Sequence, residues 1–315
     1  MRWGLLATGT ICRLFARDLA QVPGAELAAV ASRDGGRATA FAEEFGFTRA
    51  HASYDALFAD PDIDIVYIGT PHSEHTANAA AAMRAGKHVV CEKPLTVTPD
   101  ECRALIEVHK ETRRYAMEAM WTWFLPAIRQ TQQWVAAGRI GALHHIKADF
   151  GYPMPFDPDK RMFSPELAGG CLLDMGVYPV ALSWLMHKAM PTGVQVIGRR
   201  APTGVDDDFS AIFEYEDHTA TLGASFRSRL PNFAYLIGSE GYIAIPDFWR
   251  ASEAKLFDLT ECVDHFTDDR VHMGFAYEAI AAQRDIMEGK LQSDIVSLTD
   301  SLAIQTLMDA VRKAM

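Results

Sequence analysis

The chain has 315 residues, which is long enough for about two domains, and 49% of them are hydrophobic, enough for a sizeable core. A formal net charge of −11 argues against a surface that follows nucleic-acid phosphates, and no apolar run reaches the roughly 18 residues that a membrane-spanning helix needs. The five cysteines show no CxxC pair, which argues against a disulfide framework or a zinc site and favours a reducing compartment. We therefore expect a cytoplasmic protein with no metal and with no nucleic-acid or membrane partner.

In the first third of the chain, short apolar runs alternate with helical patterns. The apolar runs predict strands at residues 3–8, 26–32, 63–69, 87–91 and 115–118, and the helical patterns lie at 11–21, 36–45, 75–85 and 99–112. This alternation is typical of βαβ units and of a parallel sheet. The last of these helices has a clear start signal, with Thr98 as its N-cap, Pro99 as its first residue and Glu101 completing a capping box.

From about residue 142 the pattern changes to a series of strands with two helices after them. The expected strands are 143–152, 194–200, 209–215, 219–226, 234–237 and 242–245, with turns at 216–218 and 239–241 and helices at 273–288 and 298–314. The fold class is therefore α/β, with a Rossmann domain at residues 1–120 and an α+β substrate domain with a large, mainly antiparallel sheet at 121–315. Helices on one face of that sheet would leave the other face open, which favours a dimer or tetramer formed through it.

The first predicted strand runs into a loop that resembles a degenerate dinucleotide fingerprint. The fingerprint would have glycine at Ala7, Gly9 and Cys12, so one of three is present. A loop with one glycine is more often a plain turn, but this one lies between a strand and a helix, whose free N–H groups and positive dipole end suit a pyrophosphate. We expect the cofactor to be held here by Ala7, Gly9, Thr10 and Ile11.

The second strand ends in residues that bear on the choice between NAD and NADP. An NAD site places a carboxylate here for the ribose hydroxyls, whereas a 2′-phosphate needs cations and a hydroxyl. Ser32, Arg33 and Arg37 supply the latter, and arginine forks suit phosphate geometry. Asp34 is the dissenting residue, unless it caps a helix or turn. We therefore expect NADP, with NAD as the alternative, and plain surface arginines as the competing interpretation.

The third strand is followed by Thr70, Pro71 and His72, with His75 shortly after them. A strand that ends in Thr-Pro lies at the same edge of the sheet, so these residues are expected to line the nicotinamide side of the cofactor. His75 also fits the start of a helix, and His72 also fits an ordinary polar loop.

The fourth strand ends abruptly in Glu92, Lys93 and Pro94. Proline lacks a backbone donor and restricts the residue before it to extended conformations, so the strand stops and Lys93 lies at its carboxyl edge, where ligands bind in parallel sheets. We expect Glu92 and Lys93 to border the cofactor, with Glu92 orienting its neighbour. The competing interpretation is two solvated charges that close a strand.

Aromatic residues supply an apolar lining suited to a ring or to the C–H face of a sugar. We assign Trp121, Phe150 and Phe275 to substrate binding. Scattered aromatics more often belong to the core, and the same alternative applies to three further aromatic residues: Trp123, Phe124 and Phe156.

Taken together, these motifs resemble the glucose-fructose oxidoreductase/inositol dehydrogenase (Gfo/Idh/MocA) family over essentially the whole chain. The resemblance rests on the degenerate loop, Thr-Pro with His75, Glu-Lys-Pro, and the segment 169–178 that ends in Tyr178. Segments 117–122, 198–200 and 203–207 are most similar to dimeric dihydrodiol dehydrogenases, which use NADP and oxidise trans-dihydrodiols of arenes and pentoses such as xylose. The resemblance implies that Lys93 and Tyr178 are catalytic and that Asp174 supports them.

The chain departs from the dihydrodiol dehydrogenase pattern at two positions. An arginine usually follows the Trp-Thr pair, where this chain has Trp123, and a strand arginine is replaced by Lys147. If either position contacts substrate, the substrate differs.

Oxidation of a secondary alcohol needs a group that takes the hydroxyl proton as the hydride leaves. Free lysine and tyrosine both titrate at about pH 10, too high for a base at neutral pH, but a cationic Lys93 beside Tyr178 would stabilise its tyrosinate. We expect Tyr178 to exchange the proton and Lys93 to polarise the substrate oxygen, although the roles could be reversed. Asp174 lies four residues before Tyr178, so the two side chains project to one face if this segment is a helix. A helix-start aspartate and a core tyrosine are the competing interpretations.

Three functions fit these residues. The first is an NADP-dependent oxidoreductase acting on a trans-dihydrodiol, a pentose or a related polyol. The second is a sugar or inositol dehydrogenase, or a ketose reductase, of the same family. The third is a non-catalytic NADP-binding regulator, against which the presence of both Lys93 and Tyr178 argues, because a sensor needs no proton donor.

Overall fold

The computed structural model describes residues 1–315, which pack as two compact units. Unit 1 contains Met1–Trp121 and Val271–Leu302, and unit 2 contains Thr122–Arg270 and Ala303–Met315. The segment 271–302 thus packs with the N-terminal unit, although it follows unit 2 in the chain. The division into functional domains at residues 1–120 and 121–315 stays a prediction.

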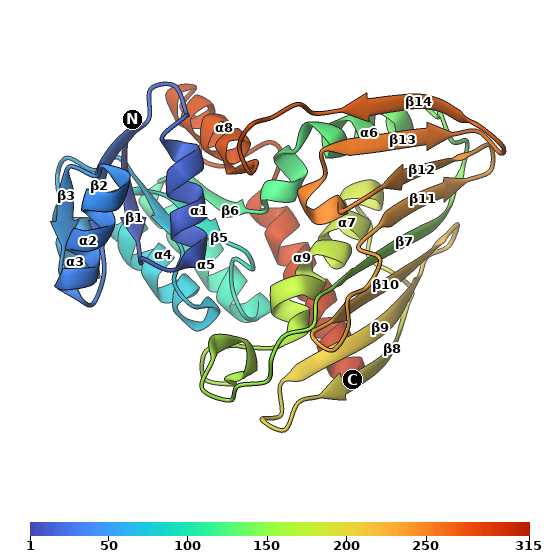
Figure 1. Ribbon diagram of the computed structural model, residues 1–315, viewed down its shortest axis with the longest axis horizontal. Coiled ribbons are helices and arrows are strands. Elements are labelled where there is room, and N and C mark those ends of the chain that lie inside the picture. The colour runs from blue at the N-terminus through green and yellow to red at the C-terminus, as the bar shows by residue number, and fades with distance from the viewer. The chain divides into compact units, whose positions relative to one another are not determined.

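Unit 1 is built on a parallel sheet of six strands in the order β3-β2-β1-β4-β5-β6 (Figure 1). The strands are β1 (Arg2–Leu6), β2 (Glu26–Ala31), β3 (Arg49–His51), β4 (Ile65–Ile68), β5 (His88–Glu92) and β6 (Ala116–Ala119). The chain reverses its direction of progress between β1 and β4, so the carboxyl ends of these two strands flank the crevice where doubly wound sheets bind ligands. The predicted parallel sheet is confirmed, and β3 is an additional short strand.

The helices of unit 1 are α1 (Thr10–Leu19), α2 (Gly35–Phe45), α3 (Tyr54–Ala59), α4 (His75–Arg84), α5 (Pro99–Thr112) and α8 (Phe275–Met287), with a short 3₁₀ turn at His72–Glu74. The predicted capping box is present, because Thr98 Oγ1 accepts from the N–H of Glu101 while Glu101 accepts from the N–H of Thr98. Buried aliphatic side chains of β1, β2, β4 and β5 pack with α4 and α5 to form the core.

Helix α8 is anchored to the N-terminal part of unit 1 by a buried carboxylate. Asp18 on α1 accepts from the N–H groups of Met273, Gly274 and Phe275 at the start of α8, at 3.2, 2.9 and 2.8 Å. These groups begin a helix and have no partners within it, so the carboxylate satisfies them and complements the helix dipole. Leu291, just after α8, also accepts from Ala116 on the edge strand β6.

Unit 2 contains a sheet of eight strands in the order β14-β13-β12-β11-β7-β10-β9-β8. The strands are β7 (Leu143–Gly151), β8 (Gly193–Arg200), β9 (Asp206–Glu214), β10 (Thr219–Ser225), β11 (Ala234–Gly238), β12 (Tyr242–Ile245), β13 (Glu253–Phe257) and β14 (Cys262–Thr267). Only the β7–β10 pair is parallel, so the prediction of a mainly antiparallel sheet is confirmed. Strands β13 and β14 extend it beyond the predicted elements.

The helices of unit 2 lie on one face of this sheet (Figure 1). Helix α6 (Pro126–Ala136) packs on β13 and β14, and α7 (Val177–His187) packs on β7 and β10. A π-helical turn, Leu172–Gly176, precedes α7, and α9 (Leu298–Ala314) enters unit 2 from Ala303 onward. Short 3₁₀ turns lie at Trp121–Phe124, Arg161–Phe163 and Phe248–Arg250.

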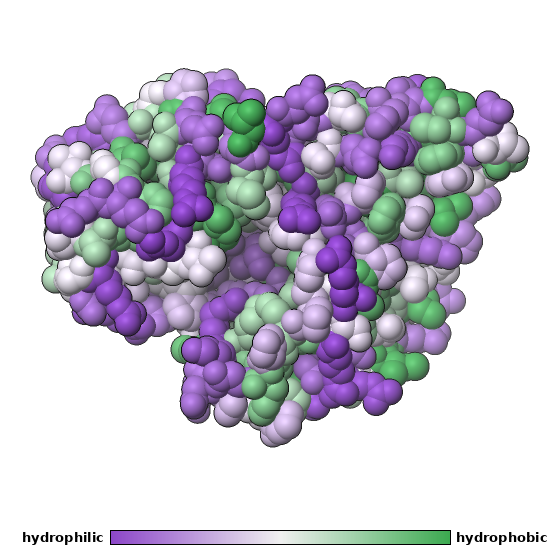
Figure 2. Space-filling view, viewed as in Figure 1, coloured by the Kyte–Doolittle hydropathy of each residue, from purple (hydrophilic) through white to green (hydrophobic).

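The opposite face of the sheet carries exposed apolar side chains, among them Ile197 and Ile212. On β9 buried and exposed residues alternate, as expected for a strand with one covered face. Hydrophilic residues cover much of the surface drawn in Figure 2, with hydrophobic ones scattered among them. None of the helices combines the length and the apolarity needed to cross a membrane.

Candidate functional site

The loop after β1 leaves the N-terminus of α1 open. Gly9 is the N-cap of α1, no side chain caps the helix, and its first turn has no acidic residue. A Cβ at Gly9 would meet no atom within 4 Å, so nothing in the protein itself requires glycine there. An uncapped helix start beside open space offers free N–H groups and a positive dipole end to an anion.

Ala7 explains why the fingerprint favours glycine at the start of this loop. Its φ is 90°, in a region that L-residues with a Cβ rarely adopt and glycine adopts freely. The chain therefore makes the turn of a dinucleotide fingerprint without the first glycine, at the cost of backbone strain.

Cys12 occupies the third glycine position and packs α1 against the end of β4. Its buried sulfur lies 3.6 Å from the carbonyl oxygen of Leu6 and 3.9 Å from that of Gly69. A Cβ added to Gly69 would overlap Cys12 Sγ, so the missing side chain of Gly69 makes room for the sulfur. Burial raises the pKa of the Cys12 thiol, which therefore stays neutral.

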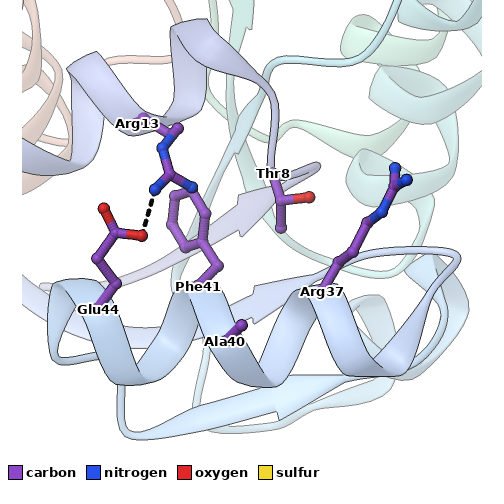
Figure 3. A pocket seen from close by; sticks show the side chains of 6 residues that line it. All are labelled: Thr8, Arg13, Arg37, Ala40, Phe41 and Glu44. Atoms are coloured by element: carbon purple, nitrogen blue, oxygen red, sulfur yellow. Dashed lines mark hydrogen bonds and ion pairs between the residues drawn. The ribbon is translucent and has the colours of Figure 1, made fainter.

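A basic pocket of about 290 Å³ lies between α1 and α2 (Figure 3). Arg13 from α1 and Arg37 from α2 lie on either side of Thr8, and the remaining lining residues are Ala40, Phe41 and Glu44. The guanidinium of Arg13 pairs with Glu44 and lies 5.7 Å from the ring centroid of Phe41. Arg37 was predicted from the sequence, whereas Arg13 was missed. Its only sequence signal was its place on the first turn of the helix after Gly9.

The other residues at the end of β2 have structural partners. Asp34 is the N-cap of α2, where Oδ1 accepts from the N–H of Arg37 at 3.1 Å. The capping interpretation of Asp34 is therefore the one that the structure supports. Ser32 is buried and accepts from the N–H of Asp34 at 3.2 Å, while Arg33 is exposed and pairs with Glu74 at 3.2 Å. Arg33 does not line the basic pocket.

His75 joins the loops that follow β4 and β5. It is fully buried as the first residue of α4, with Nε2 2.9 Å from the carbonyl oxygen of Thr70 and Nδ1 2.8 Å from that of Pro94. Thr70 Oγ1 also accepts from Asn78, and the buried His72 ring lies 5.6 Å from that of His75. His75 thus positions the loops of this edge, and a direct contact of His72 or His75 with the cofactor stays a prediction.

Glu92 orients the segment that carries Lys93. Its Oε1 accepts from the hydroxyl of Tyr67, and its Oε2 accepts from the N–H of Lys93 at 3.1 Å. Burial, and then the charge of Glu92, raise the pKa of Tyr67 well above its usual value, so the phenol keeps its proton and donates. The side chain of Lys93 is half-buried.

Unit 1 also contains a buried carboxyl group that the sequence did not indicate. Glu278 on α8 is fully buried, and neither of its side-chain oxygens has a protein hydrogen-bond partner. Burial, followed by the negative charges of Glu92 and Asp18, raises the pKa of Glu278 well above its usual value, which makes it a neutral acid.

Trp121 and Phe275, which the sequence analysis assigned to the substrate, stack on each other within unit 1. Their ring centroids are 4.5 Å apart with an interplanar angle of 23°, and both side chains are buried. Contact of either ring with substrate stays a prediction.

In unit 2, Tyr178 is the second residue of α7 and lies in an aromatic cluster. Its ring centroid is 5.5 Å from that of Phe150 and 6.2 Å from that of Trp249, and Phe150 and Trp249 stack at 4.7 Å. Phe150 was a predicted substrate residue, whereas Trp249 was missed. Trp249 comes from a 3₁₀ turn 71 residues after Tyr178, and no local pattern indicates that the two meet.

Asp174 lies in the π-helical turn, so a wider turn than an α-helical one separates it from Tyr178, and a shared face for the two side chains stays a prediction. An extra residue in the turn changes the angular offset between the two side chains, and such insertions are frequent at functional sites. Asp174 Oδ1 accepts from Arg161 Nη2 at 2.9 Å. Arg161 was also missed, because it lies 13 residues before Asp174 and outside the motif at 169–178.

Comparison with known proteins identifies the family. Residues 1–119 match the model of an oxidoreductase family with an NAD-binding Rossmann fold, and residues 128–244 match the GFO/IDH/MocA C-terminal domain. The chain belongs to the GFO/IDH/MocA oxidoreductase family. This confirms the predicted family, its fold class, a nicotinamide dinucleotide as cofactor, and an oxidoreductase as the class of enzyme.

Three relatives illustrate the range of the match. Trans-1,2-dihydrobenzene-1,2-diol dehydrogenase of Xenopus laevis is 33% identical over 318 residues, which cover 98% of this chain and 96% of the relative. Its Homo sapiens counterpart is 32% identical over 325 residues, covering 100% and 96%. A 3-ketoreductase from Actinomadura kijaniata, solved with NADP and TDP-benzene, is 27% identical with a TM-score of 0.87, covering 100% of this chain and 97% of that one.

The packing of Cys12 against Gly69 gives a test of how the open helix start is positioned. Gly69→Ala should lower the free energy of unfolding by about 1–3 kcal/mol, because the new Cβ overlaps Cys12 Sγ. Cys12→Ala in the same chain should recover at least half of that loss, since it removes the overlapping sulfur. Denaturant titrations of the two single variants and the double variant measure this coupling. Additive losses would show that the contact does not set the packing.

Proposed function

We propose that the protein is an NADP-dependent dehydrogenase that transfers hydride between the cofactor and a secondary alcohol or ketone of a trans-dihydrodiol, a pentose or a related polyol. The observation that carries the choice of NADP is the basic pocket between α1 and α2, where Arg13 and Arg37 flank Thr8. Arg13 pairs with Glu44, and Arg37 lies 3.6 Å from Asp34, which also caps α2. Both guanidinium groups are thus held beside the open start of α1, where their remaining N–H groups suit a ribose 2′-phosphate.

The residues at the carboxyl edge of the sheet fit a nicotinamide dinucleotide. The N-terminus of α1, with Ala7, Gly9, Thr10 and Ile11, would hold the pyrophosphate. Arg13 and Arg37 would hold the 2′-phosphate, and Ser32 and Arg33, which lie outside the basic pocket at the end of β2, would contact the same ribose. The nicotinamide side would be lined by the residues after β4 and β5: Thr70, Pro71, His72, His75, Glu92 and Lys93. When bound, the nicotinamide accepts or donates the hydride.

Lys93 and Tyr178 would handle the hydroxyl proton. In this proposal the phenol of Tyr178 exchanges the proton with the substrate oxygen, and the ammonium of Lys93 polarises that oxygen and stabilises the tyrosinate. Glu92 supports this role, because it holds the backbone N–H of Lys93 and so fixes the origin of its side chain. Asp174 would orient the pair or a substrate hydroxyl. The similar 3-ketoreductase has also been solved with one lysine replaced and with one tyrosine replaced, in both cases with NADP and TDP-benzene bound.

The dihydrodiol relatives and the aromatic surroundings of Tyr178 support a substrate with a flat apolar part. Phe150 and Trp249 present stacked rings beside the phenol, and Trp121 and Phe275 would add a second apolar surface. One of the two departures from the dihydrodiol dehydrogenase pattern bears little on the substrate. Lys147 is exposed between the buried Ile146 and Ala148, so its side chain lies on the uncovered face of the sheet.

We also propose a cytoplasmic homo-oligomer, either a dimer or a tetramer. The five cysteines are all unpaired, as is usual in a reducing compartment. On the uncovered face of the large sheet, Tyr242 stacks on Phe257 at 4.6 Å, and Ile197 and Ile212 are exposed. Apolar side chains on an open sheet face favour burial against a second copy.

The basic pocket predicts the cofactor preference. Arg37→Ala and Arg13→Ala should each weaken NADP binding roughly 10- to 100-fold, because each removes a charge-assisted contact with phosphate, and should change NAD binding little. Fluorescence titration with both reduced cofactors measures the two constants. Arg17→Ala, on the last turn of the same helix as Arg13, is the control and should behave as the wild type. Equal weakening for NAD and NADP would overturn the assignment of the 2′-phosphate.

The assignment of Lys93 and Tyr178 predicts loss of turnover with retention of cofactor. Lys93→Met and Tyr178→Phe should each lower kcat by about 10²- to 10⁴-fold, the usual contribution of acid–base groups, while NADP still binds. Reduced-nicotinamide absorbance would follow turnover of trans-dihydrodiols, xylose, glucose and myo-inositol. If the wild type binds NADP but oxidises or reduces none of these classes, the proposed substrate range is wrong. If turnover persists in both variants, the proton-transfer roles are wrong.

The uncovered sheet face predicts the oligomeric state. Ile212→Asp and Tyr242→Asp should each reduce the molecular mass measured by light scattering towards that of one chain, because each places a charge in an apolar interface. Val271→Asp, at an exposed apolar residue of unit 1, should leave the mass unchanged. A wild-type protein that is monomeric at micromolar concentration would contradict the proposal directly.

A further inference from the structure

Three side chains with metal-ligating atoms meet at the C-terminal end of α7, the end opposite to Tyr178. His187 is the last residue of α7, and Asp217 and His218 belong to the tight turn between β9 and β10. That turn is closed by a hydrogen bond from the N–H of Tyr215 to the carbonyl oxygen of His218 at 3.0 Å. One ligand atom from each of the three side chains lies within 4.8 Å of the other two.

The ring of His218 is held in place by its neighbours. Its Nδ1 lies 2.8 Å from Asp217 Oδ1, and its ring stacks on Tyr215 at 4.2 Å with an interplanar angle of 5°. The hydroxyl of Tyr215 is in turn 3.2 Å from Ser183 Oγ on α7. The His187 ring centroid lies 4.2 Å from that of His218. Two imidazoles and a carboxylate are thus presented together from two rigid elements.

An ordinary buried histidine would have both ring nitrogens satisfied. His218 departs from this pattern, because its side chain is fully buried and its Nε2 has no hydrogen-bond partner. This nitrogen is therefore available to coordinate a metal ion beside the His187 ring and the Asp217 carboxylate.

We propose that His187, Asp217 and His218 form a binding site for a divalent transition-metal ion of the zinc class. Imidazole nitrogen and carboxylate oxygen are ligands that Zn²⁺ accepts, at about 2.0–2.2 Å, with further positions left to water. The ligand atoms, which lie within 4.8 Å of one another, would draw together by up to about 1.5 Å to reach the edge length of a tetrahedral zinc site. Asp217 is largely exposed, which gives an ion access from solvent.

The prediction of no metal rested on the absence of a CxxC pair among the five cysteines. Here the ligands are separated by about 30 residues and come together only because the β9–β10 turn packs beside the end of α7. Tyr178 lies near the other end of the same helix, about 14 Å away along its axis. A bound ion would therefore tie the C-terminus of α7 to the sheet without reaching the proposed catalytic tyrosine, which indicates a stabilising role.

Thermal unfolding of the tag-free chain with and without Zn²⁺ tests this site. Zinc at about 100 times its Kd should raise the Tm of the wild type by a few degrees, because the ion binds the folded state alone. His187→Ala and Asp217→Asn should abolish the shift while folding normally without metal, since both side chains lie at the edge of the unit. His265→Ala is the matched control, because His265 also pairs with a carboxylate, Glu253, but has no second histidine.

Co²⁺ provides an independent measurement. The wild type should develop the visible absorption of a four- or five-coordinate cobalt ion at one equivalent, and His187→Ala should not. Absence of both the zinc shift and the cobalt spectrum in the wild type would overturn the proposal. An equal zinc shift in all four proteins would overturn it as well, because it would place the ion elsewhere on the surface.

Discussion

The close packing of α1 against the carboxyl end of β4 is the constraint on which the cofactor site depends. Cys12 and Gly69 meet where the strand order of unit 1 reverses, and the sulfur takes the space that a side chain at residue 69 would need. This contact fixes the start of α1 beside the loop at Gly9, where backbone N–H groups remain without intrahelical partners. The residues that we assign to the pyrophosphate and to the 2′-phosphate can bind one cofactor together only if this helix start keeps its position.

A second layer of buried polar contacts keeps the nicotinamide edge in shape. His75 lies between the carbonyl groups of Thr70 and Pro94, and Glu92 accepts from Tyr67 and from the N–H of Lys93. These groups are buried, so breaking any of the hydrogen bonds would leave an unsatisfied polar atom and cost free energy. The loops are therefore held in one conformation. The backbone of Lys93 is therefore held by contacts with β4 and with the loops that follow β4 and β5. Such support keeps a catalytic side chain in one position.

Much of this arrangement could be predicted from the chain because apolar strands and helix-start signals are local. The parallel strands of unit 1, the capping box at Thr98 and the loop at Gly9 all follow from patterns of a few residues. Strand β3 was missed because it has only three residues, and β14 was missed because nearly all of its side chains are exposed and show no alternation. Both are edge strands, held by backbone pairing rather than by burial.

The unpredicted parts of the site depend on contacts between distant segments. In the sequence, Arg13 resembles any surface arginine, and only the structure shows that α2 packs beside it. Trp249 likewise resembles a core aromatic residue, and only the structure shows that it stacks on Phe150. No residue pattern in the segment around Asp174 indicates a π-helical turn. The spacing between Asp174 and Tyr178 could therefore be predicted only as one ordinary helical turn. The buried acid Glu278 has no partner nearby in sequence that could have revealed it.

The carboxylate of Asp18 has a consequence for how the protein is made. It is buried on α1, yet its three donors lie at residues 273–275, beyond the whole of the large sheet. When only the first 270 residues have left the ribosome, α8 is absent and the carboxylate of Asp18 lacks its three N–H donors. The nucleotide-binding sheet then carries a negative charge with no hydrogen-bond partner from α8. The N-terminal unit cannot reach its final form until the C-terminal sheet has emerged, so synthesis and maturation of the two halves overlap in time.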